Sequence, residues 1–228
     1  MSYIFPPQAI SAVPVVGSDA LYPVHRIYCV GRNYGDHVKE MGGDPKDEAP
    51  VFFSKPANAI VVDNAPVRYP QATDDLHHEV EFVVALASGG KDIANDDALD
   101  CVFGYAVGID FTRRDLQAVA KKEGRPWDTA KGFDDSAPVS AINPVAKIGH
   151  PHNVRISLSI NGELRQDARL SQMIWSVVEI ISELSKFYEL QAGDLIYTGT
   201  PAGVAATVVG DHVVASIETV GSLEFDVI

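Results

Sequence analysis

The stretch DDLHHEVEFVVAL (residues 74–86) has the pattern of a β-strand, yet it carries two carboxylates, Glu79 and Glu81, separated by a single valine. Residues i and i+2 of a strand project from the same face, with their Cα atoms about 6.5 Å apart. Two negative charges in this arrangement repel each other, and each raises the pKa of the other. The pattern therefore predicts either that a cation lies between the two side chains or that this face of the strand is in water.

The composition of the whole chain is that of a globular domain. Its 228 residues are 46% hydrophobic and 21% charged, which is enough to form a substantial core. No apolar run approaches the roughly 18 residues of a membrane-spanning helix, and the proline-broken N-terminus lacks the basic start of a signal peptide. Cys29 and Cys101 form neither a CxxC motif nor a disulfide framework, which favours a reducing, cytoplasmic setting. A formal net charge of −13 without a basic stripe argues against nucleic acids and membranes as partners.

Extended segments outnumber helical ones along the rest of the chain. The clearest are VRISLSI and ELRQDA, joined by Asn161-Gly162, because Asn-Gly between such segments is a strong hairpin signal. The strands do not alternate regularly with helices, which favours an α+β, strand-rich fold with antiparallel or mixed sheets. Since no linker divides the chain, we expect a single domain over residues 25–228. Residues 1–24 are expected to form a short N-terminal strand segment that packs on its core.

Three segments beyond residue 90 have the pattern of helices. Apolar residues recur at helical spacing over residues 171–187, which predicts the one long helix of the protein. Residues 113–123 predict a second helix. The segment ANDDALDCV predicts a short third one, with Asn95 or Asp96 as its N-cap.

A third carboxylate, Asp110, ends the apolar strand GYAVGIDFT. A carboxylate at the end of a buried strand is costly unless it is paired or bound to a metal. Together with Glu79 and Glu81 it makes an oxygen donor set suited to Mg²⁺ or Mn²⁺. The alternative is that the two glutamates face solvent and that Asp110 caps the following helix. Strand alternation lets at most one of His77 and His78 join the acids, and satisfied or exposed histidines are the simpler interpretation.

Other segments carry residues typical of a reactive site. Asn33 is a possible cap for a short helix on which His37 and Glu40, at i and i+3, share a face, as a general base and its orienting carboxylate do. Lys131 lies in the loop WDTAKGFDD, and Gly199 lies in YTGTPAGV directly after a strand, where backbone N–H groups can converge on an anion. For each motif taken alone, an exposed pair, a solvated lysine or a plain turn is an equally simple interpretation.

Taken in order, these motifs resemble the fumarylacetoacetate hydrolase family, and more narrowly its short acylpyruvate hydrolase branch. The resemblance covers approximately residues 25–228, and the opening segment is similar to the bacterial fumarylpyruvate hydrolases of gentisate breakdown. The motifs that carry it are CVGRNYGDHVKEM, KP, LHHEVEF, GIDFTRRDLQ, GRPWDTAKGFD, NGELRQ, MIWSVVEIIS and GDLIYTGTPAGV.

The resemblance implies a mixed β-sandwich roll of the family's C-terminal domain type, usually a homodimer, with one divalent cation per subunit. It implies that Glu79, Glu81 and Asp110 hold Mg²⁺ or Mn²⁺. It further implies that His37 and Glu40 activate water and that Lys131 stabilises charge on a substrate oxygen. The positions expected to contact the substrate are Arg114, Gln117, Gly199 and Thr200, with Arg32 and Arg113 as candidates for binding a second substrate carboxylate.

The activity that this resemblance implies is metal-dependent hydrolysis of the C3–C4 bond of an acylpyruvate (a 2,4-diketo acid). Fumarylpyruvate, which would give fumarate and pyruvate in aromatic catabolism, is the first choice of substrate. Oxaloacetate decarboxylation or keto–enol isomerisation with the same metal–enolate chemistry is the alternative. A pure decarboxylase has no need of a water-activating base, so the His37–Glu40 pair favours hydrolysis. A module that binds a metal or ligand without turnover is a third hypothesis.

Overall fold

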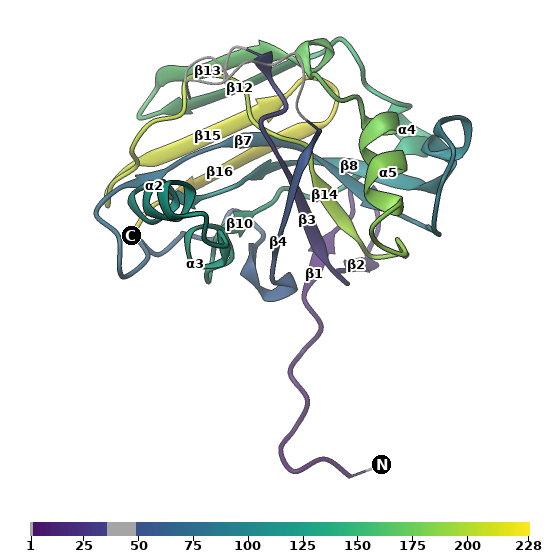
Figure 1. Ribbon diagram of the computed structural model, residues 1–228, viewed down its shortest axis with the longest axis horizontal. Helices are drawn as coiled ribbons and strands as arrows, with labels where there is room; N and C mark the ends of the chain where they lie inside the picture. Colours follow the sequence, from purple (N-terminus) through teal and green to yellow (C-terminus); the bar gives the residue numbers. More distant parts are fainter. Residues whose placement is uncertain (1, 36–48) are drawn as a thin grey trace.

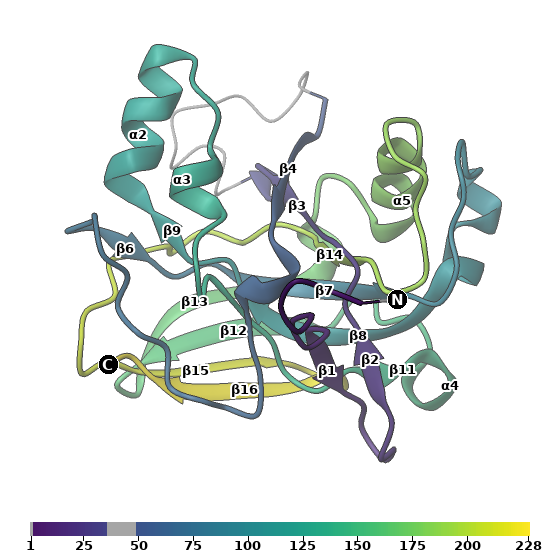
Figure 2. The same ribbon diagram turned by 90° about the horizontal axis from the view of Figure 1, so that it is seen from below.

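The computed structural model describes residues 2–35 and 49–228. Two β-sheets stacked on each other form its body, and short helices cover the edges (Figures 1 and 2). The larger sheet is mixed, with strand order β11-β8-β7-β14-β3-β4, because β14 and β3 are parallel while the other neighbours are antiparallel. The smaller sheet is antiparallel, in the order β13-β12-β15-β16. The predicted α+β, strand-rich class is confirmed.

The strands of the larger sheet are β3 (Ile27–Gly31), β4 (Val51–Lys55), β7 (Val80–Leu86), β8 (Val102–Ile109), β11 (Asn143–Pro144) and β14 (Leu195–Tyr197). Those of the smaller sheet are β12 (Arg155–Ile160), β13 (Glu163–Arg169), β15 (His212–Ile217) and β16 (Gly221–Asp226). Three short ladders pair β1 (Ala12–Pro14) with β2 (Leu21–Pro23), β5 (Ile60–Val61) with β10 (Ala137–Pro138), and β6 (Leu76–His77) with β9 (Thr112–Arg113).

The described helices are α2 (Arg114–Glu123), α3 (Asp128–Lys131), α4 (Val145–Ile148) and α5 (Val177–Ser185). Single 3₁₀ turns are η1 (Ala57–Ala59), η2 (Asn95–Asp97), η3 (Leu99–Cys101) and η4 (Leu170–Gln172). In this described part of the chain, no helix is long and apolar enough to cross a membrane.

Strands β7 and β8 are buried on both faces, and their alternation determines what each face contains. Val80, Phe82 and Val84 point into the core between the two sheets. Val83 and Ala85 point to the opposite face, where β1 and β2 cover them. Because Glu79 and Glu81 have the same parity as Val83 and Ala85, they belong to this second face, at its open end.

The hairpin predicted at Asn161-Gly162 is confirmed. The two residues connect β12 and β13 with φ angles of 52° and 80°, as a type I′ turn requires. The helix predicted over residues 113–123 is also confirmed as α2, and it ends at Gly124, which has a left-handed φ of 64°.

Two helix predictions need correction. The long helix expected over residues 171–187 is only α5, because the backbone N–H groups of Ile174 and Trp175 bind the backbone and side-chain oxygens of Asn33 instead of helical carbonyls. Ser176 then caps the helix through a capping box with Glu179. The segment ANDDALDCV forms two 3₁₀ turns, and neither Asn95 nor Asp96 is an N-cap.

Candidate active site

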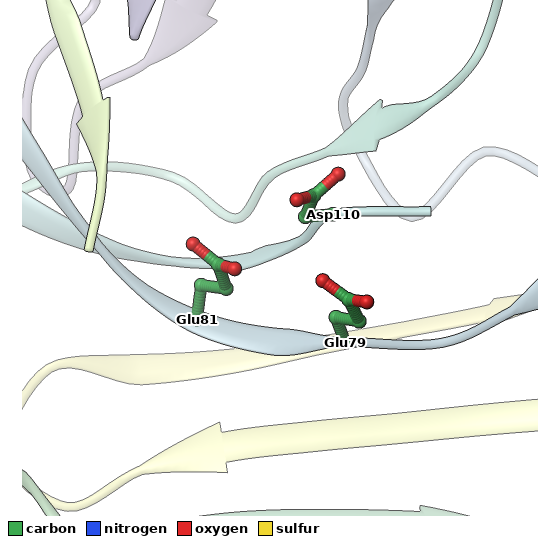
Figure 3. A group of neighbouring side chains, drawn as sticks. All are labelled: Glu79, Glu81 and Asp110. Atoms are coloured by element: carbon green, nitrogen blue, oxygen red, sulfur yellow. The ribbon is translucent and has the colours of Figure 1, made fainter. Parts of the chain in front are cut away.

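Three carboxylates converge where β7 and β8 reach the open end of their shared face. Glu79 directly precedes β7, Glu81 lies within it, and Asp110 directly follows β8. The register places Val80 opposite Ile109, and the N–H of Asp110 donates to the carbonyl of Glu79 at 2.9 Å. The side chains point toward one another (Figure 3), with one oxygen of each lying within 4.8 Å of the others, and all three residues are at most 5% exposed.

Three cations surround this cluster. Lys131 Nζ, at the end of α3, lies 2.8 Å from Glu79 Oε2 and 2.6 Å from Asp110 Oδ2. Arg114 Nη2 lies 2.5 Å from Glu79 Oε1. Lys55 Nζ lies 2.9 Å from Asp110 Oδ1, which is close enough for an ion pair although the angles are poor for a hydrogen bond. In their ionised states, the three cations balance the formal charge of the three carboxylates.

Glu81 has a different environment. Its Oε2 accepts a 2.8 Å hydrogen bond from the backbone N–H of Gly199. Burial raises the pKa of Glu81 well above its usual value, and the carboxylates of Asp110 and Glu79 raise it further. Burial lowers the pKa of Lys131, but Asp110 and Glu79 outweigh this effect and raise it above its usual value. Glu81 is thus the carboxylate that lacks sufficient positive charge.

The donor set fits a divalent cation. Mg²⁺ and Mn²⁺ prefer carboxylate oxygens and tolerate partial coordination by protein, and these three buried oxygens lie at the right mutual spacing. A cation beside Glu81 would also remove the repulsion that raises its pKa. The alternative in which the glutamates face solvent is wrong, as is a capping role for Asp110, because α2 begins after Arg113.

A pocket lies above the carboxylates and collects most of the residues expected to contact the substrate. Its lining includes Arg32, Arg114, Gln117 and Thr200 together with Lys131. Arg114 Nη1 donates to Gln117 Oε1 at 2.6 Å, which fixes both side chains on the inner face of α2. The other residues of the lining are Val30, Gly31, Phe53, Glu79, Glu81, Asp110, Lys121 and Trp127.

The loop after β14 is held by close contacts that require its glycine. Gly199 has a φ of 99°, and a Cβ at this position would lie 2.6 Å from Cβ of Asn33. The side-chain nitrogen of Asn33 donates to the carbonyls of Thr198 and Trp175, at 2.7 and 2.9 Å. This arrangement points the Gly199 N–H at Glu81.

Two predicted substrate residues do not line this pocket: Gly199, whose N–H donates to Glu81, and Arg113. The guanidinium of Arg113 lies 4.4 Å from the ring centre of Phe133 and donates to the carbonyl of Thr129. It lines a separate pocket with Arg68 and Asp135. Adjacent residues at the start of α2 point in different directions, so Arg113 and Arg114 cannot both face the carboxylates.

His37 and Glu40, the predicted water-activating pair, lie outside the described residues. The histidines beside the carboxylate cluster do not join it, and each has a side-chain partner, although Nε2 of the buried His78 has none among the described residues. His77 Nε2 lies 2.9 Å from Asp75 Oδ1, and His78 Nδ1 lies 3.1 Å from Gln166 Oε1. Burial lowers the pKa of His78 to about 4, which keeps it neutral.

Three residues of the site were not predicted from the sequence. Lys55 contacts Asp110 from β4, and Gln166 Nε2 donates to Thr200 Oγ1 at 2.8 Å from β13. Lys121 lines the pocket one helical turn beyond Gln117. Only Lys121 had a usable signal, because it follows Arg114 by seven residues and so shares its helix face.

Comparison with known proteins agrees with this site. The fumarylacetoacetate (FAA) hydrolase C-terminal family model matches residues 26–228. The structure of fumarylpyruvate hydrolase from Pseudomonas aeruginosa in complex with Mn²⁺ and pyruvate has a TM-score of 0.98 at 46% identity, covering 100% of this chain and 99% of that chain. Mitochondrial oxaloacetate tautomerase FAHD1 of Rattus norvegicus is 48% identical over 201 residues, which are 88% of this chain and 90% of that protein. Oxaloacetate tautomerase YcgM of Escherichia coli is 40% identical over 198 residues, 86% of this chain and 90% of its own length. The chain belongs to the fumarylacetoacetate hydrolase family, as the order of its motifs predicted, and has a buried group of three carboxylates that could hold a metal ion.

Proposed function

We propose that this enzyme hydrolyses the C3–C4 bond of fumarylpyruvate to give fumarate and pyruvate, as in gentisate-type aromatic catabolism. The observation that carries the proposal is the cluster of three buried carboxylates at the base of a pocket that four cationic side chains also line. The full-length similarity to the Pseudomonas aeruginosa fumarylpyruvate hydrolase supports the choice of substrate.

The charges in the pocket favour a substrate with two negative charges. The carboxylates are already balanced by Lys55, Lys131 and Arg114. A divalent cation would therefore leave two positive charges at the base of the pocket, and Arg32 and Lys121 lie above it. A dicarboxylate such as fumarylpyruvate offsets more of this positive charge than a monocarboxylate does.

The residues of the chain have distinct roles in the proposed reaction. A bound divalent ion supplies a Lewis acid that polarises the oxygens of a 2-keto acid. His37, oriented by Glu40, takes a proton from the water that attacks C4, the C3–C4 bond breaks, and pyruvate leaves as its enolate and is protonated at C3. Lys131 supplies positive charge near the developing enolate oxygen, where such charge lowers the barrier most. Arg114, Gln117, Gly199 and Thr200 position the substrate.

Oxaloacetate keto–enol tautomerisation is the second candidate, supported by the 48% identity to the rat oxaloacetate tautomerase. Oxaloacetate is also a dianionic 2-keto acid, so the same charge argument applies to it. Tautomerisation moves one proton between C3 and the C2 oxygen and consumes no water. A water-activating pair is therefore needed only for the hydrolase.

The deciding experiment assays wild-type enzyme and His37→Ala with Mg²⁺, Mn²⁺ or EDTA, offering fumarylpyruvate, acetylpyruvate and oxaloacetate. Metal-dependent cleavage of fumarylpyruvate, faster than that of acetylpyruvate and lost in His37→Ala, is the expected result. Tautomerisation or decarboxylation of oxaloacetate alone, undiminished in His37→Ala, would replace the hydrolase assignment with the second candidate.

The assembly and domain division are part of the same proposal. We propose a homodimer with one ion per subunit and a single catalytic domain over residues 25–228. Of the N-terminal segment 1–24, which we expected to pack on this domain, β1 and β2 do so, whereas residues 2–10 are exposed and extend away from it (Figure 1). Light scattering coupled to size exclusion measures the subunit number, and metal analysis measures the ion content of each subunit.

A further inference from the structure

The inner face of α2 carries three polar residues in a row. Arg114, Gln117 and Lys121 lie at i, i+3 and i+7, and all three line the pocket above the carboxylates. Arg114 contacts Glu79, and Gln117 contacts Arg114. Because each helical turn advances about 5.4 Å, Lys121 lies farther from the carboxylates along the helix axis than the other two.

The ammonium of Lys121 is held at this position without a carboxylate partner among the described residues. Its Nζ lies 5.3 Å from the ring centre of Trp127, whose ring in turn packs against Phe53. Both aromatic residues also line the pocket. The cation is therefore anchored by an aromatic face and remains available to an anion inside the pocket.

The surroundings of Lys121 make an anion favourable there. Burial, and after it the positive charges of Arg114 and Arg32, lower its pKa to about 8. The side chain is half-buried, so water screens these charges incompletely. The neighbouring Lys122 is exposed and does not line the pocket.

We propose that Lys121 binds the distal carboxylate of the substrate and thereby selects 2-keto acids that carry a second carboxylate. This inference rests on the proposed function in that the 2-keto end of the substrate lies at the three carboxylates. A substrate oriented in this way extends along α2, past Arg114 and Gln117. Its far end then meets Lys121, and Arg113, on the other side of the helix, has no part in recognition.

The test is equilibrium binding of two matched, non-hydrolysable ligands to the Mn²⁺-loaded enzyme, followed by calorimetry. The ligands 2-oxoheptanedioate and 2-oxoheptanoate share a seven-carbon chain and a 2-keto acid end, and differ only in the distal carboxylate. The variants are Lys121→Met, Lys121→Arg and the matched control Lys122→Met. Wild-type cleavage of fumarylpyruvate is measured separately on the same preparation.

Lys121→Met should weaken binding of the dioate by roughly tenfold or more, because a charge-assisted hydrogen bond is lost. It should leave binding of 2-oxoheptanoate within about twofold of wild type, since that ligand never contacts the lysine. Lys121→Arg should retain most of the preference, and Lys122→Met all of it. Equal weakening of both ligands, or no change in either, would overturn the proposal.

The binding measurement is independent of turnover. If wild-type enzyme fails to cleave fumarylpyruvate but Lys121→Met loses the preference for the dioate, the proposed hydrolase function fails and the role of Lys121 stands. If wild type cleaves fumarylpyruvate and Lys121→Met keeps the preference, only the role of Lys121 fails.

Discussion

Gly108 lies at the most crowded point of the sheet beneath the carboxylates. It pairs with Glu81 across β7 and β8 and precedes Asp110 by two residues. A Cβ built on Gly108 would lie 2.6 Å from Cε1 of Tyr197 and 2.6 Å from Cγ2 of Val83. Neither neighbour has room to move, because both are fully buried and the hydroxyl of Tyr197 is hydrogen-bonded.

Gly108→Ala should therefore destabilise the protein by overpacking. Forcing one methyl group into a packed interior costs about 1–3 kcal/mol. For a chain of this size, 1 kcal/mol corresponds to roughly 2–4 °C, so thermal unfolding should shift down by roughly 2–12 °C. Because the strain falls between Glu81 and Asp110, Mn²⁺ affinity measured by calorimetry should fall as well.

Gly31→Ala is the matched control. Gly31 is also in the larger sheet, but the nearest atoms to its added Cβ lie at an ordinary 3.6 Å, and its φ is not left-handed. Its stability should stay within about 1 kcal/mol of wild type, because removing a glycine mainly restricts the unfolded chain. If Gly108→Ala melts at the same temperature as Gly31→Ala, the sheet can relax at this point and the packing argument is wrong.

Three further changes test the carboxylate cluster and the support of Thr200 by Gln166. Because the pKa of Glu81 is raised in the folded state, its contribution to stability is fully present below its usual pKa of 4.5 and is lost as the pH rises through the folded value. Metal-free Glu81→Gln should therefore be more thermally stable than wild type toward neutral pH, while losing Mn²⁺ affinity. Melting curves over a pH series, with and without Mn²⁺, check this, and parallel curves for both proteins would contradict it. Lys131→Met removes the cation shared by Glu79 and Asp110 and should lower the free energy of unfolding of the metal-free protein by about 3–5 kcal/mol. Added Mg²⁺ should restore part of this stability. Denaturant unfolding measures both effects, and a loss that Mg²⁺ leaves unchanged would argue against a cation site here. Gln166→Leu leaves the buried polar partners of Gln166 unpaired, which should lower the free energy of unfolding by about 1–3 kcal/mol for each partner. It should also raise KM, because the hydroxyl of Thr200 loses its partner. An unchanged KM in a folded variant would show that Gln166 does not position Thr200.

The convergence of the three carboxylates was predictable because it depends on a local rule. Strand alternation places Glu79 and Glu81 on one face wherever the strand lies in the fold. Asp110 was predictable for the same reason, as a carboxylate at the end of an apolar strand. The hairpin at Asn161-Gly162 likewise depends only on the conformations that two adjacent residues can adopt.

The features that the sequence did not reveal depend on contacts between distant segments. The apolar periodicity over residues 171–187 is real, but Asn33 captures the N–H groups at its start from a position more than a hundred residues away. Lys55 reaches Asp110 from β4 in the same way. No local pattern identifies such partners, because the sequence around a lysine or asparagine does not show whether its side chain lies in water or contacts a distant segment.

The balance of three carboxylates by three cations has a consequence for metal retention. With the formal charges already matched, a divalent ion relieves the repulsion at Glu81 but leaves the base of the pocket with a net positive charge. The ion and a dianionic ligand must then strengthen each other's binding, and thermodynamic linkage makes the two effects equal. A chelator should therefore strip the ion readily from the resting enzyme and far less readily from enzyme saturated with substrate or product, so that occupancy of the metal site follows the supply of the substrate.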